Sequence, residues 1–198
     1  MASDEFPLLA FPDASAFEAW LAVQPPAALG AWLKFAKKGA PEATISKSNA
    51  IDCALAYGWV DGRLGRIDDH FFKTRFTPRR PGSAWSQVNR ARVERLLTVG
   101  RIMPLGLVQI DKAKADGRWA AAYAPQSQAA PETDLAAALD AQPAARALFD
   151  ALDSANRYAV LYRVHQAKTP ESRTAKIAGL VAMLARGETI HPRRPRRT

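Results

Sequence analysis

The sequence has little of what marks an exported, membrane-spanning or metal-binding protein. Its 198 residues include a single cysteine, Cys53, and three histidines, so an internal disulfide is excluded and no zinc-type Cys/His spacing is present. No run approaches the roughly 18 apolar residues that span a bilayer. The first residues carry Asp4 and Glu5, where a signal peptide carries Lys or Arg. We therefore expect a cytoplasmic protein with no metal, no cofactor and no membrane insertion.

Motifs that would assign a reaction are also missing. The sequence has no glycine-rich phosphate loop and no nucleophile elbow. His70, His165 and His191 stand at no spacing typical of metal ligands. Cys53 lies in a helical pattern with no histidine partner indicated, so we interpret it as a small core residue and not as a nucleophile. The sequence therefore assigns no catalytic residue.

The chain is rich in positive charge, and that charge is concentrated. The formal net charge is +9, while 48% apolar and 24% charged residues are values of a globular protein. Residues 63–118 carry thirteen Lys or Arg against five Asp or Glu, and residues 193–198 add four arginines. Such regions attract anions, although a charged run is also a common form of solvated surface.

Hydrophobic periodicity predicts both helices and strands in the N-terminal half. Caps, glycines and prolines set the ends of each element. The expected helices begin near 14, at Ser46, at Ser83 or Ser86 and near 104, and the expected strands cover 31–37, 59–64 and 70–77. The last two strands are spaced for a hairpin.

Alternation along the strands assigns their side chains to two faces. In the first strand, Trp32 and Lys34 alternate with Leu33 and Phe35. The predicted core face of the hairpin is apolar and contains Val60, Leu64, Phe72 and Phe76. The predicted opposite face gathers charged side chains beside one aromatic ring, namely Trp59, Asp61, Arg63, Lys73 and Arg75.

The fold class indicated is α+β, with a small antiparallel sheet of about three strands and helices in the N-terminal half and an all-α C-terminal half. The expected organisation is an α+β domain at 1–82, bridging helices at 83–123, a linker at 124–134, a helical module at 135–190 and a basic tail at 191–198. We expect the tail to be a disordered cationic arm, because its prolines prevent a helix.

Arginines that precede a capped helix predict an anion site. Guanidinium groups beside the N–H groups at the positive end of a helix favour a phosphate or a carboxylate. The candidate ligand-binding residues are Lys34, Trp59, Asp61, Arg63, Arg75, Arg79, Arg80, Trp85 and Ser86. The alternative interpretation is structural: Asp61 pairs with Arg75 or Arg63, and the tryptophans join the sheet to a helix.

Several of these motifs resemble the YdeI/OmpD-associated proteins, often described as bacteriocin-protection proteins. In the N-terminal half, the resemblance rests on Lys34 with Lys37, the 58–62 and 75–80 runs and the Trp85-Ser86 helix start. In the C-terminal half, residues 152–158, 167–173 and 177–187 are similar to the short helical OmdA module of that family. The resemblance implies a role in resistance to bacteriocins or cationic peptides, and it implies no catalytic residue.

Three functions stay open at this point. The preferred one is a cytoplasmic stress-protection or bacteriocin-protection protein, not an enzyme, that binds an anionic small molecule or protein partner through a basic face. The first alternative is an enzyme acting on a small anionic metabolite, with Asp52 or Asp61 as acid or base. The second is a nucleic-acid-binding protein that uses the same face and weak contacts from the arginine tail. Because the chain itself is positively charged, we expect any protection against cationic peptides to be indirect.

Overall fold

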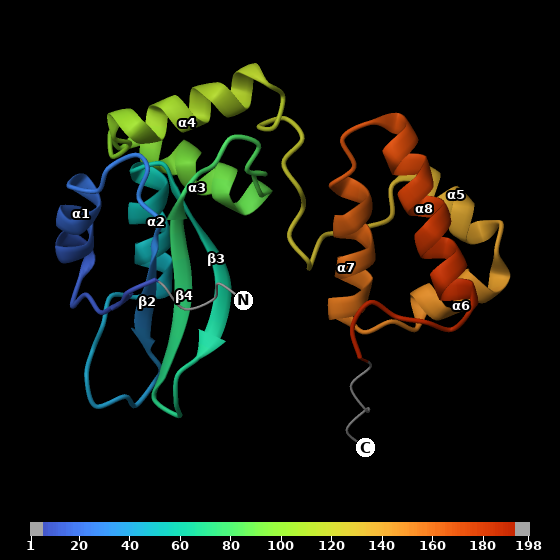
Figure 1. Ribbon diagram of the computed structural model, residues 1–198, viewed down its shortest axis with the longest axis horizontal. Coiled ribbons are helices and arrows are strands. Elements are labelled where there is room, and N and C mark those ends of the chain that lie inside the picture. Colours follow the sequence, from blue (N-terminus) through green and yellow to red (C-terminus); the bar gives the residue numbers. More distant parts are fainter. Residues whose placement is uncertain (1–5, 193–198) are drawn as a thin grey trace. The chain divides into compact units, whose positions relative to one another are not determined.

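The computed structural model describes residues 6–192, and the chain divides into two compact units, residues 1–122 and 123–198 (Figure 1). Each unit has its own hydrophobic core. Within the described residues, the elements of the N-terminal unit are β1 (Leu8–Leu9), α1 (Ala14–Ala22), β2 (Ala31–Ala36), α2 (Lys47–Ala56), β3 (Trp59–Arg66), β4 (Phe71–Pro78), α3 (Gln87–Thr98) and α4 (Pro104–Ala115).

The sheet of the N-terminal unit has the strand order β1-β2-β4-β3. β4 is antiparallel to both β2 and β3, whereas β1 is parallel to β2. The predicted α+β class is confirmed, but the sheet has four strands and is mixed, not antiparallel with about three. The sequence could not indicate β1, because its two residues are too few to show any periodicity.

Side-chain caps fix the helix starts where the sequence predicts them. The Ser46 hydroxyl accepts a hydrogen bond from the Asn49 backbone N–H at 3.1 Å and begins α2. The Ser86 hydroxyl does the same for the Asn89 N–H at 3.1 Å and begins α3. Of the two serines proposed as the cap of α3, Ser86 is therefore the correct one. Each cap satisfies a backbone donor that has no partner within its helix.

α1 and α2 pack on one face of the sheet. Alternate residues of the central strands point toward these helices, as strand geometry requires. The buried core that results contains Phe17, Leu21, Ala31, Leu33, Phe35, Ile45, Ala50, Cys53, Ala54, Trp59 and Phe76. The interpretation of Cys53 as a core residue is confirmed, because its side chain is only 1% exposed.

The register of the hairpin shows that the start of β3 presents its side chains to the faces opposite to those predicted. Directly opposed residues of an antiparallel pair share a face. Asp61 is opposite Phe76, and Val60 is opposite Thr77. Trp59 and Asp61 therefore lie on the face covered by the helices, and Val60 lies on the other face, the reverse of the prediction.

A β-bulge explains why strict alternation misleads in this strand. Between Asp61 and Leu64 the register shifts, because Asp61 is opposite Phe76 and Leu64 is opposite Thr74. The extra residue that β3 contains here breaks its period of two. Beyond this shift Leu64 is opposite Thr74 and so lies on the core face, as predicted, but its side chain is 58% exposed and not buried. In the regular strand β4, by contrast, Lys73 and Arg75 share a face that does not contain Phe76, as predicted.

α3 and α4 form a second small core with α2. Trp85, Val93, Leu96 and Ile110 are buried in it. Gly106 permits the close approach of α4 to α2, because a Cβ at this position would lie 2.2 Å from the backbone oxygen of Ala56.

The described part of the C-terminal unit is helical, which confirms the predicted all-α half. Its elements are α5 (Thr133–Asp140), α6 (Pro143–Asp150), α7 (Ser154–His165) and α8 (Pro170–Ala185). Their shared core contains Leu135, Leu139, Ala145, Phe149, Val160, Leu161, Val164, Ile177, Leu180, Val181 and Leu184. Across residues 6–192, every helix is too short or too polar to cross a membrane. Of the predicted basic tail, 191–198, residues 193–198 with its arginines lie outside the described residues.

Candidate functional site

The face of the sheet opposite α1 and α2 carries cations over aromatic rings. We refer to Trp32, Lys34, Phe71, Lys73 and Arg75 as the cationic sheet face. Lys34 Nζ lies 3.7 Å from the centroid of the Phe71 ring, and Lys73 Nζ lies 4.6 Å from that of Trp32. Both rings are nearly buried, at 7% and 6% exposed, as expected when aliphatic lysine stems cover apolar surface and leave the ammonium groups toward water.

The strand register places like charges directly opposite one another on this face. Lys34 of β2 is the direct partner of Lys73 of β4. Arg75 is two residues farther along β4 on the same face, opposite Trp32. Like charges in directly opposed positions destabilise a sheet, so these three cations form a surface that an anion would stabilise.

Carboxylates of the described residues neutralise this surface only in part. Among the described residues, Lys34 forms an ion pair with Glu42, whose oxygen is 3.7 Å away and whose side chain is 75% exposed, and it also contributes to the lowered pKa of Asp68. Within residues 6–192, Lys73 and Arg75 form no ion pair. The buried Nε1 of Trp32 and Nε of Arg75 also have no hydrogen-bond acceptor in the described part. An anionic oxygen would supply the opposite charge that these cations lack.

Other predicted site residues have structural roles instead. The Arg79 guanidinium carbon lies 3.5 Å from the centroid of the Trp85 ring, and its Nη1 donates to the Ala84 carbonyl at 3.2 Å. Arg79 is only 6% exposed and Trp85 only 2%. Ser86 caps α3. These three residues fix the connection between β4 and α3.

The remaining candidates lie apart from the cationic sheet face or at the surface. Trp59 is in the core under α1 and α2, a different cluster from that of Trp85. Asp61 lies 3.8 Å from Lys47 Nζ, and it pairs with neither of the arginines proposed for it. Arg63 and Arg80 are exposed. Of the nine predicted residues, the structure thus brings Lys34 and Arg75 together on one face.

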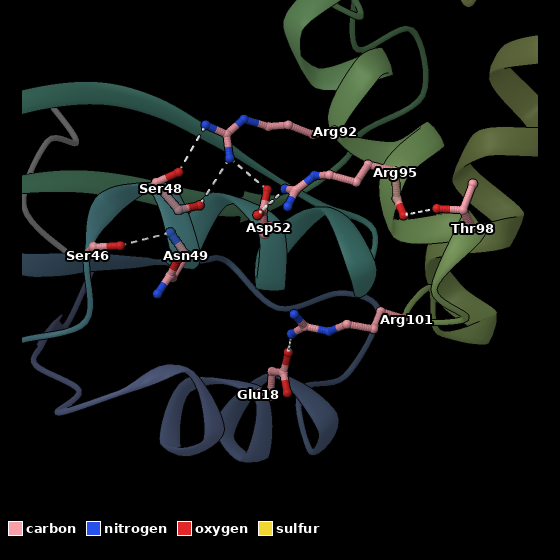
Figure 2. A network of polar contacts seen from close by, with 9 residues as sticks. All are labelled: Glu18, Ser46, Ser48, Asn49, Asp52, Arg92, Arg95, Thr98 and Arg101. Carbon is pink, nitrogen blue, oxygen red and sulfur yellow. Dashed lines mark hydrogen bonds and ion pairs between the residues drawn. The ribbon is translucent and has the colours of Figure 1, made fainter.

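Asp52, the other acid considered for catalysis, belongs to a network that joins α2 to α3 (Figure 2). Its two oxygens accept hydrogen bonds from Arg92 at 2.7 Å and from Arg95 at 2.5 Å. Arg92 also donates to the Ser48 hydroxyl and carbonyl at 3.2 Å. Both carboxylate oxygens are therefore occupied by guanidinium groups, and much of the positive charge of α3 is used within the fold.

A second pair in Figure 2 joins α1 to the segment after α3. Arg101 donates to the Glu18 carboxylate, and this contact, together with the negative charge it adds, raises the pKa of the guanidinium further. Glu18 is also among the groups that raise the pKa of the buried Cys53 thiol, after burial itself. Over residues 6–192, no group of three or more His, Cys, Asp or Glu is arranged to hold a metal ion.

Sequence reasoning left Trp32, Phe71 and Lys73 out of the candidate site. The alternation in the first strand already placed Trp32 beside Lys34, and that in the hairpin placed Lys73 beside Arg75. The missing information was that β2 pairs with β4. These strands are separated in the chain by α2 and β3, so no local pattern predicts their pairing or its register.

Comparison with known proteins gives two family matches, one in each unit of the chain. Residues 9–109, about half of the chain, match the family described as a domain of unknown function (DUF8412). Residues 130–187 match the family described as "Bacteriocin-protection, YdeI or OmpD-Associated", or OmdA. The predicted resemblance to that second family is confirmed over this part of the chain. Searches of curated proteins and of solved structures each gave no match.

Proposed function

The chain belongs to the DUF8412 family and joins that domain to an OmdA-type module, and on this premise we propose that it is a cytoplasmic, non-enzymatic protein that binds an anion through the cationic sheet face. One observation carries the proposal, the direct cross-strand opposition of Lys34 and Lys73 with Arg75 beside them. The bound anion would offset the repulsion that this register creates.

The positions of Asp52 and Asp61, the two acids considered for catalysis, support binding over catalysis. A reaction on the bound anion would need an acid or base within hydrogen-bond reach. Asp61 lies on the helix-covered face of the sheet, opposite Phe76, and Asp52 is held by two arginines of α3. Neither acid is therefore on the cationic sheet face.

The OmdA description mentions bacteriocin protection, and we propose that any such role of this chain is indirect. Bacteriocins and related peptides that carry positive charge are repelled by a protein of net charge +9. A cationic face instead suits an anionic metabolite or an acidic partner protein, whose level or activity would then affect resistance.

The test is binding of inorganic pyrophosphate, measured by calorimetry at low salt. We expect Lys73→Met to weaken binding about tenfold or more, since a charge-assisted hydrogen bond contributes ~1.5–3 kcal/mol. Methionine keeps an unbranched stem over Trp32, so the variant should fold. Lys38→Met removes an exposed lysine of the same unit that lies outside this face, and it should bind as the parent does.

Two outcomes would contradict the proposal. Equal losses of pyrophosphate affinity in Lys73→Met and Lys38→Met would show that binding depends only on the net charge of the protein. Absence of pyrophosphate binding, combined with tight binding of a single-stranded oligonucleotide that weakens steeply with salt, would favour a nucleic-acid-binding protein instead.

A further inference from the structure

The C-terminal unit contains a hollow between α7 and α8 that its core does not fill. The hollow has a volume of about 470 Å³, which lies within the ~300–1,000 Å³ typical of small-molecule sites. Its apolar wall is formed by Tyr162 of α7 and by Leu180 and Met183 of α8. Methionine adapts its shape to an apolar occupant more readily than branched side chains do.

Gly179, in the middle of α8, lines this hollow and has no packing reason to be glycine. A Cβ at this position would have no atom within 4 Å, so α8 does not need a glycine here to approach a neighbour. The helix has no need of glycine for its backbone either, because the φ of Gly179 is not positive. Glycine inside a helix costs about 1 kcal/mol relative to alanine. What the glycine provides is the open space itself.

Two cations border the hollow. Arg163 and Lys176 are exposed and line it from α7 and α8. Neither forms an ion pair with any residue of the described part of the chain. Their helical neighbours three and four residues away include no Asp or Glu, so the usual intrahelical partner is also missing.

The other arginines of residues 123–192 are all paired with carboxylates. Each has a carboxylate oxygen within 4 Å, and they are Arg146, Arg157, Arg173 and Arg186. Over residues 123–192, Arg163 is the arginine that has no ion pair with a carboxylate. A carboxylate supplied by a ligand would give Arg163 the partner that its neighbours find within the fold.

We propose that this hollow binds an amphipathic carboxylate, a molecule with an unbranched acyl chain and one anionic head. The acyl chain would lie against Tyr162, Leu180 and Met183, in the space that Gly179 leaves open. The carboxylate would lie at the rim, between Arg163 and Lys176. This site is separate from the cationic sheet face, and it does not depend on the function proposed for that face.

The experiment compares the binding of decanoate and of 1-decanol to the full chain by calorimetry. Decanoate is kept below its critical micelle concentration, and 1-decanol below its solubility limit. Both probes have the same alkyl chain, but only decanoate carries a charge. We expect decanoate to bind at one site and at least tenfold more tightly than 1-decanol. Arg163→Gln and Lys176→Gln should each reduce that preference, whereas Lys168→Gln, an exposed lysine of the same unit outside the hollow, should leave it unchanged.

Gly179 provides a test that misfolding cannot imitate. Gly179→Ala should raise the thermal stability of the protein, because alanine favours the helix, and Gly179→Leu should fill the hollow and reduce decanoate affinity at least tenfold without loss of helix content. Equal affinity for decanoate and 1-decanol would overturn the proposal. So would unchanged binding in Gly179→Leu, or loss of decanoate binding in Lys73→Met, which would place the probe on the sheet.

Discussion

At the scale of single residues, the one cysteine illustrates how burial controls reactivity. Cys53 is 1% exposed, and burial, reinforced by the negative charge of Glu18, raises the pKa of its thiol to about 12. The thiolate is the reactive form of cysteine, and at pH 8 almost none is present. Cys53 is thus held inert by its position on the buried face of α2, in the core that α2 forms with α1 and the sheet.

We therefore predict that Cys53 does not react in the folded protein. Incubation with iodoacetamide at pH 8 should leave the native chain unlabelled over hours, while the chain in concentrated guanidinium should be labelled completely, as measured by mass spectrometry. Glu18→Gln should not make the thiol reactive, because burial is the larger cause. Rapid labelling of the native protein would contradict this account of the core.

At the scale of elements, the sequence predicted each strand and helix better than it predicted their pairing. Ser46 and Ser86 mark helix starts through bonds to residues three positions away, which a local pattern contains. The bulge after Asp61 and the opposition of Lys34 and Lys73 depend on distant strands. For this reason the predicted site included Lys34 and Arg75 but also Trp59 and Arg79, whose surroundings are set by the assembled fold.

An ion pair between elements gives a prediction for acid pH. The guanidinium of Arg173 in α8 donates to Asp134 in the first turn of α5 at 2.6 and 2.7 Å, and this contact lowers the pKa of the Asp134 carboxyl to about 2. In the unfolded chain the group has its ordinary value of 3.8. Because the folded value is the lower one, the stabilisation is complete above about pH 4 and is lost as the pH falls toward 2.

The carboxyl carbon shift of Asp134, followed by NMR, should accordingly titrate near pH 2 and move toward 3.8 in Arg173→Gln. The Asp134 side chain is 49% exposed and the Arg173 side chain 23%, so solvent screens the pair and Asp134→Asn should lower the free energy of unfolding at pH 6 by no more than about 1 kcal/mol. This difference should disappear near pH 2. Asp111→Asn, an exposed acid of α4 with no ion pair among residues 6–192, is the matched control. A midpoint near 3.8 in the parent protein would show that the pair does not form.

At the scale of the whole molecule, two family matches correspond to two separate cores. The DUF8412 match, 9–109, lies inside the N-terminal unit, and the OmdA match, 130–187, lies inside the C-terminal one. The sheet and its cationic face belong to the first unit, and the hollow between α7 and α8 belongs to the second. The two proposed sites therefore have different structural supports, and a variant that unfolds one unit need not remove the other site.

This arrangement predicts that residues 123–192 fold alone. Every residue of the C-terminal core, together with the partly buried residues against it, lies within 129–190, so the fragment keeps all of that buried apolar surface. Domains of roughly 60–70 residues are only marginally stable, and we expect a cooperative but shallow thermal transition by circular dichroism. Phe149→Ala, which empties a fully buried position, costs ~3–5 kcal/mol in comparable cores and should unfold the fragment. A parent fragment with helical signal but no cooperative transition would show instead that this core depends on the N-terminal unit.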